Sequence, residues 1–333
     1  MRFERLAYLP LAAAALVAGC SPAPTTVPGG SAQSRLSVAM ALQNTWSSGK
    51  PIPHPVTGAA AASLDGKIYV LGGLDNTLSP YGVTQIYDTR KKIWTTGASM
   101  PTPRWDVGAV LLGGIIYTVG GNYTEATAST AVEAYDPRGN SWSKRAALPF
   151  ANAPSVARLG SLIFAIGGYT TGSGRIANVY AYDPESNSWK ERKSLAVAKS
   201  NFGVGTIGNS MIAAAGVANS GYTTDNEAFS KKDNAWTAEA SAPISLAAPC
   251  FGVIQGSLYM AGGEDDGSTG TTNAAESYTL EGNAWKMLAP MKQSQVGAAS
   301  AVSRGQLYCI GGASQGYPNA GTTFYNNVQI YTP

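Results

Sequence analysis

A period of 47 to 49 residues runs through most of this chain, and it constrains the fold more than any other feature. Pairs of small residues recur at this spacing: Gly72-Gly73, Gly120-Gly121, Gly167-Gly168, Ala215-Gly216, Gly262-Gly263 and Gly311-Gly312. Tryptophan recurs independently with the same period: Trp46, Trp94, Trp142, Trp189, Trp236 and Trp285. Because two unrelated residue types share one period, the sequence indicates six copies of one structural unit.

Each copy has the pattern of four short strands. In the first copy, Asp65-Gly66 lies between two apolar runs and predicts a hairpin turn, because both central positions of such a turn need a positive φ. The second strand ends in the glycine pair, the third ends in Tyr87-Asp88, and the fourth carries Trp94. Four short strands in about 48 residues are typical of a propeller blade.

Composition and charge narrow the class of protein further. The chain has 39 glycines, and only 13% of its residues are charged, against about 25% in typical soluble domains. Long amphipathic helices need a charged outer face, so this composition favours strands and turns. The net charge is +3 without a block of like charge, which argues against a nucleic-acid partner.

These units resemble kelch repeats, whose Gly-Gly, Tyr-Asp and Trp positions recur here over about residues 44–333. The resemblance implies an all-β, six-bladed kelch-type β-propeller, with local departures such as Ala215 in the fourth unit. The last unit stops at Tyr331-Thr332-Pro333, before its Trp strand, whereas Asn44-Thr45-Trp46 repeats the Asn-x-Trp of the other units. We therefore predict that the N-terminal Trp46 strand completes the last blade and removes a free sheet edge.

The N-terminus has the pattern of an export signal. Arg2 and Arg5 precede an apolar run that is too short to span a bilayer, so residues 1–19 are interpreted as a signal peptide. The run ends in a segment that resembles a bacterial lipobox, which implies lipid attachment at Cys20. Ser21 then suggests sorting to the outer membrane of a Gram-negative bacterium. Residues 20–43 are rich in Pro, Thr, Ser and Gly and are predicted to be a flexible tether, so the lipid is the only membrane contact that we expect.

Metal and cofactor chemistry has few candidate residues. Histidine is the commonest transition-metal ligand and general base, and the chain contains only His54, between two prolines before the first blade. The two-histidine copper site of galactose oxidase, a secreted kelch-type enzyme, cannot be assembled, and a Ser-His-Asp triad would have to use that one imidazole. We expect no metal, no cofactor and no catalytic set of these kinds.

Two cysteines remain after Cys20 is assigned to the lipid. Cys250 lies on a predicted innermost strand, and Cys309 precedes the glycine pair of the next blade. An exported protein can form disulfides, but facing sheets lie about 10 Å apart, beyond the Cα limit near 7 Å for a disulfide. Buried free thiols are therefore the favoured expectation, and a disulfide is the alternative.

Ligand recognition is expected at the face where the blade loops converge on the channel. One loop precedes each innermost strand, and another follows each glycine pair, so both kinds lie on one rim. These loops carry aromatic, amide, carboxylate and basic side chains, which offer flat apolar contacts and directional hydrogen bonds and so are suited to binding a polar ligand. The predicted rim residues are Arg104, Trp105, Lys199, Asn201, Tyr123, Glu125, Tyr169, Glu264, Asp265 and Tyr317.

The alternatives at individual positions remain open. Trp105 fits blade packing as well as binding, and the acidic run Glu264-Asp265-Asp266 is by default a solvated loop rather than a calcium site.

Three functions fit these patterns. The favoured one is a lipid-anchored recognition module of the cell envelope that binds a glycan, peptide or partner protein at the rim. The second is a cofactor-free mutarotase that resembles the bacterial kelch enzyme acting on sialic acid anomers, with Arg104 and Glu125 or Glu264 as an acid–base set. The third is a structural scaffold of the cell envelope, in which the rim binds no ligand.

Overall fold

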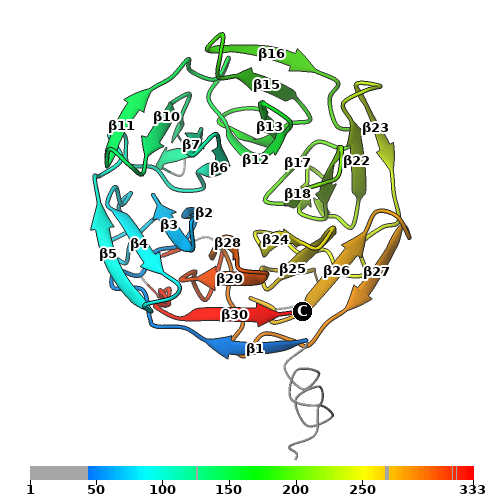
Figure 1. Cartoon of the computed structure of the whole chain (residues 1–333). Coiled ribbons are helices and arrows are strands. Elements are labelled where there is room, and N and C mark those ends of the chain that lie inside the picture. Colours follow the sequence, from blue (N-terminus) through cyan, green and yellow to red (C-terminus); the bar gives the residue numbers. More distant parts are fainter. Residues whose placement is uncertain (1–43, 125–126, 267–269, 317, 320) are drawn as a thin grey trace, which may run out of the picture. The chain divides into compact units, whose positions relative to one another are not determined.

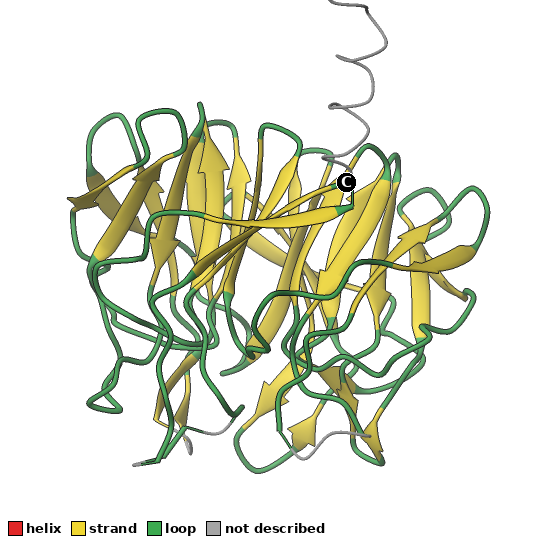
Figure 2. Cartoon of the chain, turned by 90° about the horizontal axis from the view of Figure 1, so that it is seen from below, coloured by secondary structure: helices red, strands yellow, loops and turns green. Residues whose placement is uncertain are grey.

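The computed structural model describes residues 44–124, 127–266, 270–316, 318–319 and 321–333, and these form antiparallel sheets without a helix. Six of the sheets share a path of four strands and are arranged around a central axis like the blades of a propeller (Figure 1). The strands run between two faces that carry the connecting loops (Figure 2). The all-β architecture predicted from the sequence is confirmed.

The blades follow one another along the chain, and each is listed here from its innermost to its outermost strand. The first three blades are β2 (Ala60–Leu64), β3 (Lys67–Leu71), β4 (Thr84–Asp88) and β5 (Ile93–Gly97); β6 (Gly108–Leu112), β7 (Ile115–Val119), β10 (Val132–Asp136) and β11 (Ser141–Lys144); and β12 (Ala153–Leu159), β13 (Leu162–Thr170), β15 (Val179–Asp183) and β16 (Ser188–Arg192). The last three are β18 (Gly203–Ile207), β19 (Ser210–Ala214), β22 (Asn226–Ser230) and β23 (Ala235–Ala238); β24 (Cys250–Ile254), β25 (Ser257–Ala261), β26 (Ala275–Thr279) and β27 (Ala284–Met287); and β28 (Ala299–Ser303), β29 (Gln306–Ile310), β30 (Val328–Thr332) and β1 (Thr45–Ser48).

Short accessory strands extend the loops. They are β8 (Asn122–Thr124), β9 (Thr127–Ala128), β14 (Gly174–Arg175), β17 (Lys199–Ser200), β20 (Val217–Ala218) and β21 (Gly221–Tyr222).

The N-terminal strand completes the last blade, as predicted. β1 pairs antiparallel with β30, and Trp46 lies opposite Tyr331 in the register. The innermost strands also contact one another in the closed order β2, β6, β12, β18, β24, β28 and back to β2. The two ends of the described chain therefore meet in one blade, which pairs the edge that would otherwise be free.

The glycine pairs recur because each blade approaches the next one closely. The N–H of Gly73 donates to the carbonyl of Arg104 in the following blade at 2.9 Å, and Gly312 closes the ring by donating to Val56 at 2.8 Å. A Cβ on Gly72 would lie 2.5 Å from the Arg104 carbonyl oxygen. Both glycines of the pair also have positive φ, so glycine serves a steric and a conformational need at once.

The Asn-x-Trp motif joins neighbouring blades at their outer edges. In the second blade, Trp142 Nε1 donates to the carbonyl of Ala98 in the first blade at 2.9 Å. Asn140 Oδ1 accepts from the Ala98 amide at 2.7 Å and from the Tyr135 hydroxyl at 2.7 Å. Asn140 has φ +47, a conformation that asparagine tolerates better than most residues. This junction explains why aromatic, Asn and Trp positions repeat together.

The hydrophobic core lies between blades as well as within them. One cluster combines Phe164 and Ile166 of the third blade with Met211 and Phe229 of the fourth. Each blade is thus a layer that buries its faces against its neighbours, which is why a single blade could not be stable alone.

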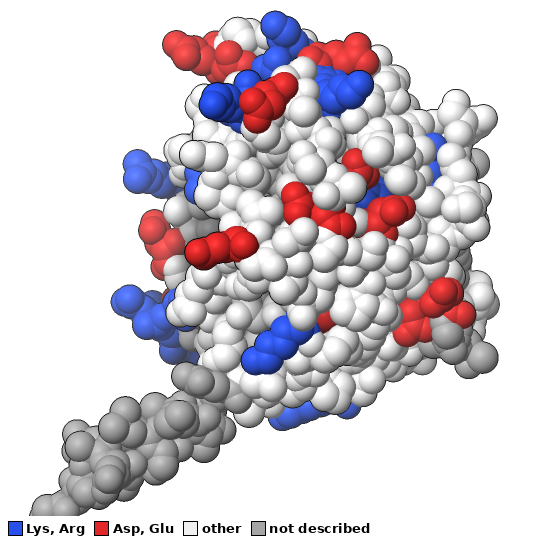
Figure 3. Space-filling model, turned by 90° about the vertical axis from the view of Figure 1, so that its right-hand side faces the viewer, with Lys and Arg blue, Asp and Glu red and all other residues white. Residues whose placement is uncertain are grey.

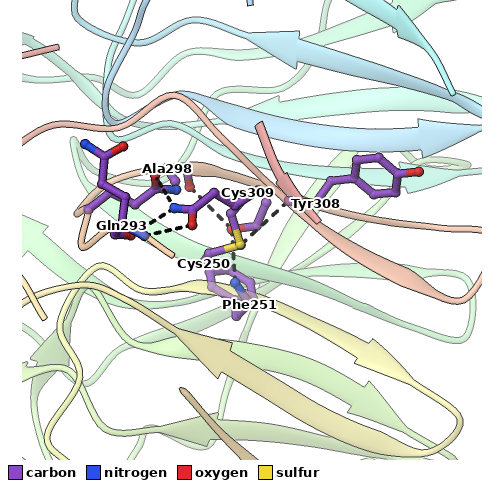
Figure 4. Close-up of a disulfide and its surroundings, with 9 residues drawn as sticks. Cys250, Phe251, Gln293, Ala298, Tyr308 and Cys309 are labelled. Carbon is purple, nitrogen blue, oxygen red and sulfur yellow. Dashed lines mark hydrogen bonds between the residues drawn. A yellow bond between two sulfur atoms is a disulfide. The ribbon is translucent and has the colours of Figure 1, made fainter. Parts of the chain in front are cut away.

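The expectation of two free thiols is wrong. Cys250 of β24 and Cys309 of β29 form a disulfide, with their Cα atoms 5.6 Å apart (Figure 4). A spacing of about 10 Å holds for sheets that pack face to face in parallel layers, but blades radiate from an axis and converge near it. β24 is an innermost strand, close to the axis, and it contacts both β28 and β29 of the next blade. The two cysteines therefore come within disulfide range.

The predicted signal peptide, Cys20 and the tether lie outside the described residues. Within the part of the chain that the structure describes, no helix is long and apolar enough to cross a membrane. Basic and acidic side chains are interspersed on the side of the propeller seen in Figure 3, without a patch of one sign on that face.

Candidate functional site

A pocket of about 430 Å³ opens at the end of the central channel where the loops that precede the innermost strands meet the loops that follow the glycine pairs. Every blade contributes to its lining. Its volume lies in the range of about 300 to 1,000 Å³ that is usual for small-molecule sites. The pocket therefore has the size of a small-molecule site.

Six equivalent residues, one from each blade, form a ring within the lining. They are Gly58, Asp106, Pro154, Asn201, Ala248 and Gly297. Five of the six have positive φ, and only Pro154 does not. Three of these five, Asp106, Asn201 and Ala248, are not glycine, and non-glycine residues in this conformation are uncommon.

Backbone hydrogen bonds join one side of this ring. The amide of Gly58 donates to Gly297 at 2.8 Å, that of Gly297 to Ala248 at 3.1 Å, and that of Ala248 to Asn201 at 2.7 Å. The remaining side consists of Asp106 and Pro154, and proline has no N–H to donate. Backbone hydrogen bonds thus connect the ring members of blades one, six, five and four in a continuous row, and Asp106 and Pro154 lie outside this row.

Asp106 places a carboxyl group in the pocket without a partner. Among the described residues, no hydrogen bond or ion pair involves its side chain, and a Cβ built on Gly58 would lie 2.7 Å from its Oδ1. Desolvation by burial raises the pKa of Asp106 to about 7. A carboxyl group with such a pKa can donate or accept a proton near neutral pH.

Arg175 brings a basic group to the same pocket. It lies on β14 in the loop that follows the third glycine pair, and its backbone is held by Asn219, which accepts from the Arg175 amide at 3.2 Å and donates to its carbonyl at 3.1 Å. Its buried Nε has no hydrogen-bond partner, and the described residues include no carboxylate paired with its guanidinium. A fixed backbone with an unpaired guanidinium is suited to binding an anion.

Two tyrosines and a glutamate complete the polar lining. Tyr169 and Tyr222 also line the pocket and are 38% and 39% exposed, high values for large aromatic side chains. Glu264 accepts from the Gly316 amide at 2.7 Å and from the Tyr222 hydroxyl at 3.4 Å. These contacts orient the carboxylate between the loops of blades four, five and six, while the tyrosines offer flat apolar surface.

Two residues predicted to bind a ligand at the rim, Arg104 and Lys199, are structural instead, so that prediction is wrong for them. Arg104 is fully buried and pairs with Glu133 at 2.8 Å, and it also donates to backbone carbonyls of its own blade. Lys199 is fully buried, lies 3.7 Å from Glu227, and donates to the carbonyls of Ala213 and Asp225.

The physical reason is the alternation of side chains along an extended segment. The position that these two residues share faces the interior of the blade, and its counterparts Val56, Leu246 and Gln295 are buried too. Burial lowers the pKa of Arg104 and of Lys199, and the paired glutamates partly offset this effect. Neither side chain is available to a ligand.

The structure brings four of the predicted rim residues together. Trp105, Asn201, Tyr169 and Glu264 line the pocket, and Trp105 is buried there, so it serves both packing and the pocket wall. Tyr123 is half-exposed outside the pocket lining, and its hydroxyl accepts from Ser129 at 2.9 Å. Asp265 is also outside the lining. Glu125 and Tyr317 lie outside the described residues.

Sequence reasoning missed the two residues with the most distinctive chemistry. Asp106 follows Trp105 directly, and its place in the six-fold ring could have been found from the repeat, because Asn201 occupies the equivalent position of the fourth blade. Arg175 has no counterpart in the repeat, and only its place after a glycine-rich turn marks it. Loop conformation decides where such a side chain points.

The described residues contain no group of three or more His, Cys, Asp or Glu side chains able to hold a metal ion. His54 lies apart from the pocket lining, stacks on Tyr81 with ring centroids 4.0 Å apart, and has its Nε2 3.4 Å from Asp75. The chemistry that the pocket offers is thus that of carboxyl, guanidinium, hydroxyl and amide groups.

Comparison with known proteins agrees with the blade pattern. A family model described as the Kelch motif matches residues 55–101, 103–149 and 152–195. The chain carries kelch motif repeats. The matched kelch segments begin near the loops that precede the innermost strands of the first three blades, and each extends past the Trp strand of its blade.

The propeller is also similar to the solved structure of YjhT, with a TM-score of 0.72 and 17% sequence identity over 86% of this chain and 97% of that chain. At this level of identity the similarity concerns the fold. The comparison with curated proteins finds no match.

Proposed function

We propose that this kelch propeller is a recognition module that binds a glycan with an anionic group in the pocket at the channel mouth. The observation that carries the proposal is the presence of an unpaired guanidinium, Arg175, in the same concave pocket as the half-exposed Tyr169 and Tyr222. Tyrosine faces suit the apolar faces of sugar rings, and the guanidinium suits a carboxylate or phosphate.

The shape of the site favours a small ligand segment over a flat protein surface. A protein partner would require a broad contact area of about 800 Å² on this side, whereas a pocket encloses most of a small ligand. Asn201 and Glu264 add directional hydrogen-bonding groups around the pocket. A peptide with an acidic side chain is the competing ligand that the experiment below distinguishes.

We further propose that the module is held at the outer membrane by a lipid on Cys20, with the signal peptide and tether described above. Labelling of growing cells with a palmitate analogue tests this part. Incorporation into the wild-type chain and its loss after Cys20→Ala are expected, and equal labelling of both would contradict the anchor.

Binding of D-glucuronate to the purified full chain, compared with binding of D-glucose, tests the pocket. We expect saturable binding of the uronate and a reduction of at least about tenfold in its affinity after Arg175→Gln, because the truncation removes a charge-assisted contact. Arg138→Gln, a change in an exposed turn, is the matched control. Preference for an acidic peptide over the uronate, or unchanged affinity after Arg175→Gln, would overturn the glycan proposal.

A second candidate function is supported by Asp106. A cofactor-free mutarotase needs a group that can exchange a proton with the ring oxygen or anomeric hydroxyl of a sugar, and the raised pKa of Asp106 suits that role near neutral pH. Glu264 lines the same pocket, whereas the buried Arg104 of the earlier hypothesis does not.

Exchange of sugar anomers followed by NMR tests this second function. Acceleration by the wild-type protein and its loss after Asp106→Asn would support catalysis. Equal exchange rates with and without the protein, over neutral and acidic sugars, would leave the pocket as a binding site.

A further inference from the structure

The six-fold ring at the channel mouth singles out Asp106 as its only ionisable member. The equivalent positions hold Gly58, Pro154, Asn201, Ala248 and Gly297, none of which can carry a charge on its side chain. Asp106 has φ +48, so the backbone holds this carboxyl in place through a conformation that aspartate adopts only with local support. The blade architecture thus fixes one acidic group at the pocket wall.

Among the described residues, no basic side chain forms an ion pair with Asp106 that would stabilise its ionised form. The innermost strands of its own and the two adjacent blades, β2, β6 and β12, carry a single titratable side chain, the exposed Arg158. Besides Asp106, the titratable groups of the pocket lining are Tyr169, Arg175, Tyr222 and Glu264, and burial alone accounts for the altered pKa of Asp106. A carboxyl group in such surroundings favours its neutral form.

An anionic ligand makes this preference stronger. Arg175 is suited to bring a negative charge into the pocket, and that charge makes ionisation of Asp106 less favourable still. A protonated carboxyl has an O–H that can donate a hydrogen bond, whereas an ionised one can only accept.

We propose that Asp106 determines ligand specificity as a protonated carboxylic acid, which donates a hydrogen bond to an acceptor oxygen of the anionic ligand, so that binding takes up a proton. This inference rests on the proposed function of the pocket. It means that the pocket accepts an anion together with a proton, and that its affinity decreases as the pH rises through neutrality.

The magnitude follows from the fraction of protein that is ready to bind. If only the protonated form binds, the apparent dissociation constant rises in inverse proportion to the protonated fraction. With a pKa of about 7 for Asp106, the affinity is expected to be about tenfold weaker at pH 8 than at pH 6.

Isothermal titration of the purified full chain with D-glucuronate at pH 6, 7 and 8 tests the inference. Buffers with different ionisation enthalpies reveal the uptake of a proton. Asp106→Asn is an informative variant, because asparagine tolerates positive φ, keeps a donor at every pH, and already occupies the equivalent position as Asn201. The variant is expected to bind with the same affinity from pH 6 to pH 8 and without proton uptake.

Asp65→Asn is the matched control, since Asp65 also has positive φ, at +52, but lies in an exposed hairpin turn outside the pocket. It is expected to retain the wild-type pH dependence. Binding that does not change with pH in the wild type, or a pH dependence that survives Asp106→Asn, would overturn the role of Asp106 and leave the proposed function in place. No binding of the uronate at any pH would overturn the proposed function and this inference together.

Discussion

Replacing Glu276 by glutamine should stabilise the protein, and by an amount that grows with pH. Glu276 lies on β26 and is fully buried, and no cation pairs with its carboxyl group among the described residues. The equivalent glutamates of blades two and four each have a cation in the position that Leu246 occupies in blade five. Burial raises the pKa of Glu276 to about 8, and the backbone of Ile244 only partly offsets this effect.

The sign follows from the proton that each state binds. Between pH 4.5, the ordinary pKa, and pH 8, the folded state keeps the proton that the unfolded state releases, so stability falls as the pH rises. The two pKa values correspond to a loss of about 3 kcal/mol at pH 7, relative to strongly acidic pH where both states are protonated. Glutamine is neutral throughout and does not incur this loss.

The protein itself supports the choice of residue. Gln85 and Gln329 occupy the equivalent position in blades one and six, and both bond to the backbone of the loop that precedes the innermost strand: Gln85 to both backbone groups of His54, and Gln329 to those of Gln293. Glutamine in blade five has the backbone of Ile244 as the corresponding partner.

Urea denaturation of wild-type protein and Glu276→Gln at pH 5 and pH 8 measures the effect. The variant is expected to gain about 3 kcal/mol more, relative to the wild type, at pH 8 than at pH 5. Glu281→Gln, an exposed change in the same blade, is the control and should show no such gain. Equal pH dependence of stability in wild type and Glu276→Gln would refute the assignment of a buried neutral carboxyl group.

Three other changes test the architecture. Arg104→Met should destabilise the fold by about 3 kcal/mol or more, because Glu133 is left buried without a partner, and adding Glu133→Leu should recover most of the loss in the same urea assay. Replacing both Cys250 and Cys309 by alanine should cost about 4 kcal/mol, as expected for a disulfide that closes a loop between residues 59 apart, and an unchanged melting temperature would contradict this estimate. Asn140→Gly keeps the positive φ but removes two hydrogen bonds at the junction of blades one and two, so the free energy of unfolding should fall by about 2 kcal/mol. Unchanged unfolding in a calorimeter would contradict this role of Asn140.

The repeating elements of the fold could be predicted because their causes are local. Turn residues such as Asp65-Gly66, strand alternation, and the Asn-x-Trp motif act within one unit and recur at one period. The pairing of β1 with β30 was predictable for the same reason, since the missing strand of the last unit is visible at the start of the domain. The hydrogen bonds that the motif makes to the neighbouring blade, however, became clear only in the structure.

The candidate site was predicted in part. Of the residues predicted to lie together on the rim, Trp105, Asn201, Tyr169 and Glu264 do meet in one pocket. Arg104, by contrast, is a basic residue in a loop, and its sequence context does not distinguish a blade interior from a ligand site. The direction of its side chain follows from the alternation of side chains along the extended segment that leads into the innermost strand.

The sequence by itself thus determined the four-stranded repeat and the way in which the first and last strands of the propeller pair. It could do so because every copy carries the same burial pattern and the same turn residues. Only the tertiary structure decided the contacts made by residues that are not repeated from blade to blade. Convergence of the blades toward the axis brings Cys250 and Cys309 into bonding range, and closure of the ring places Asp106 and Arg175 in one pocket. These outcomes depend on distances between blades, which no residue of a single repeat specifies.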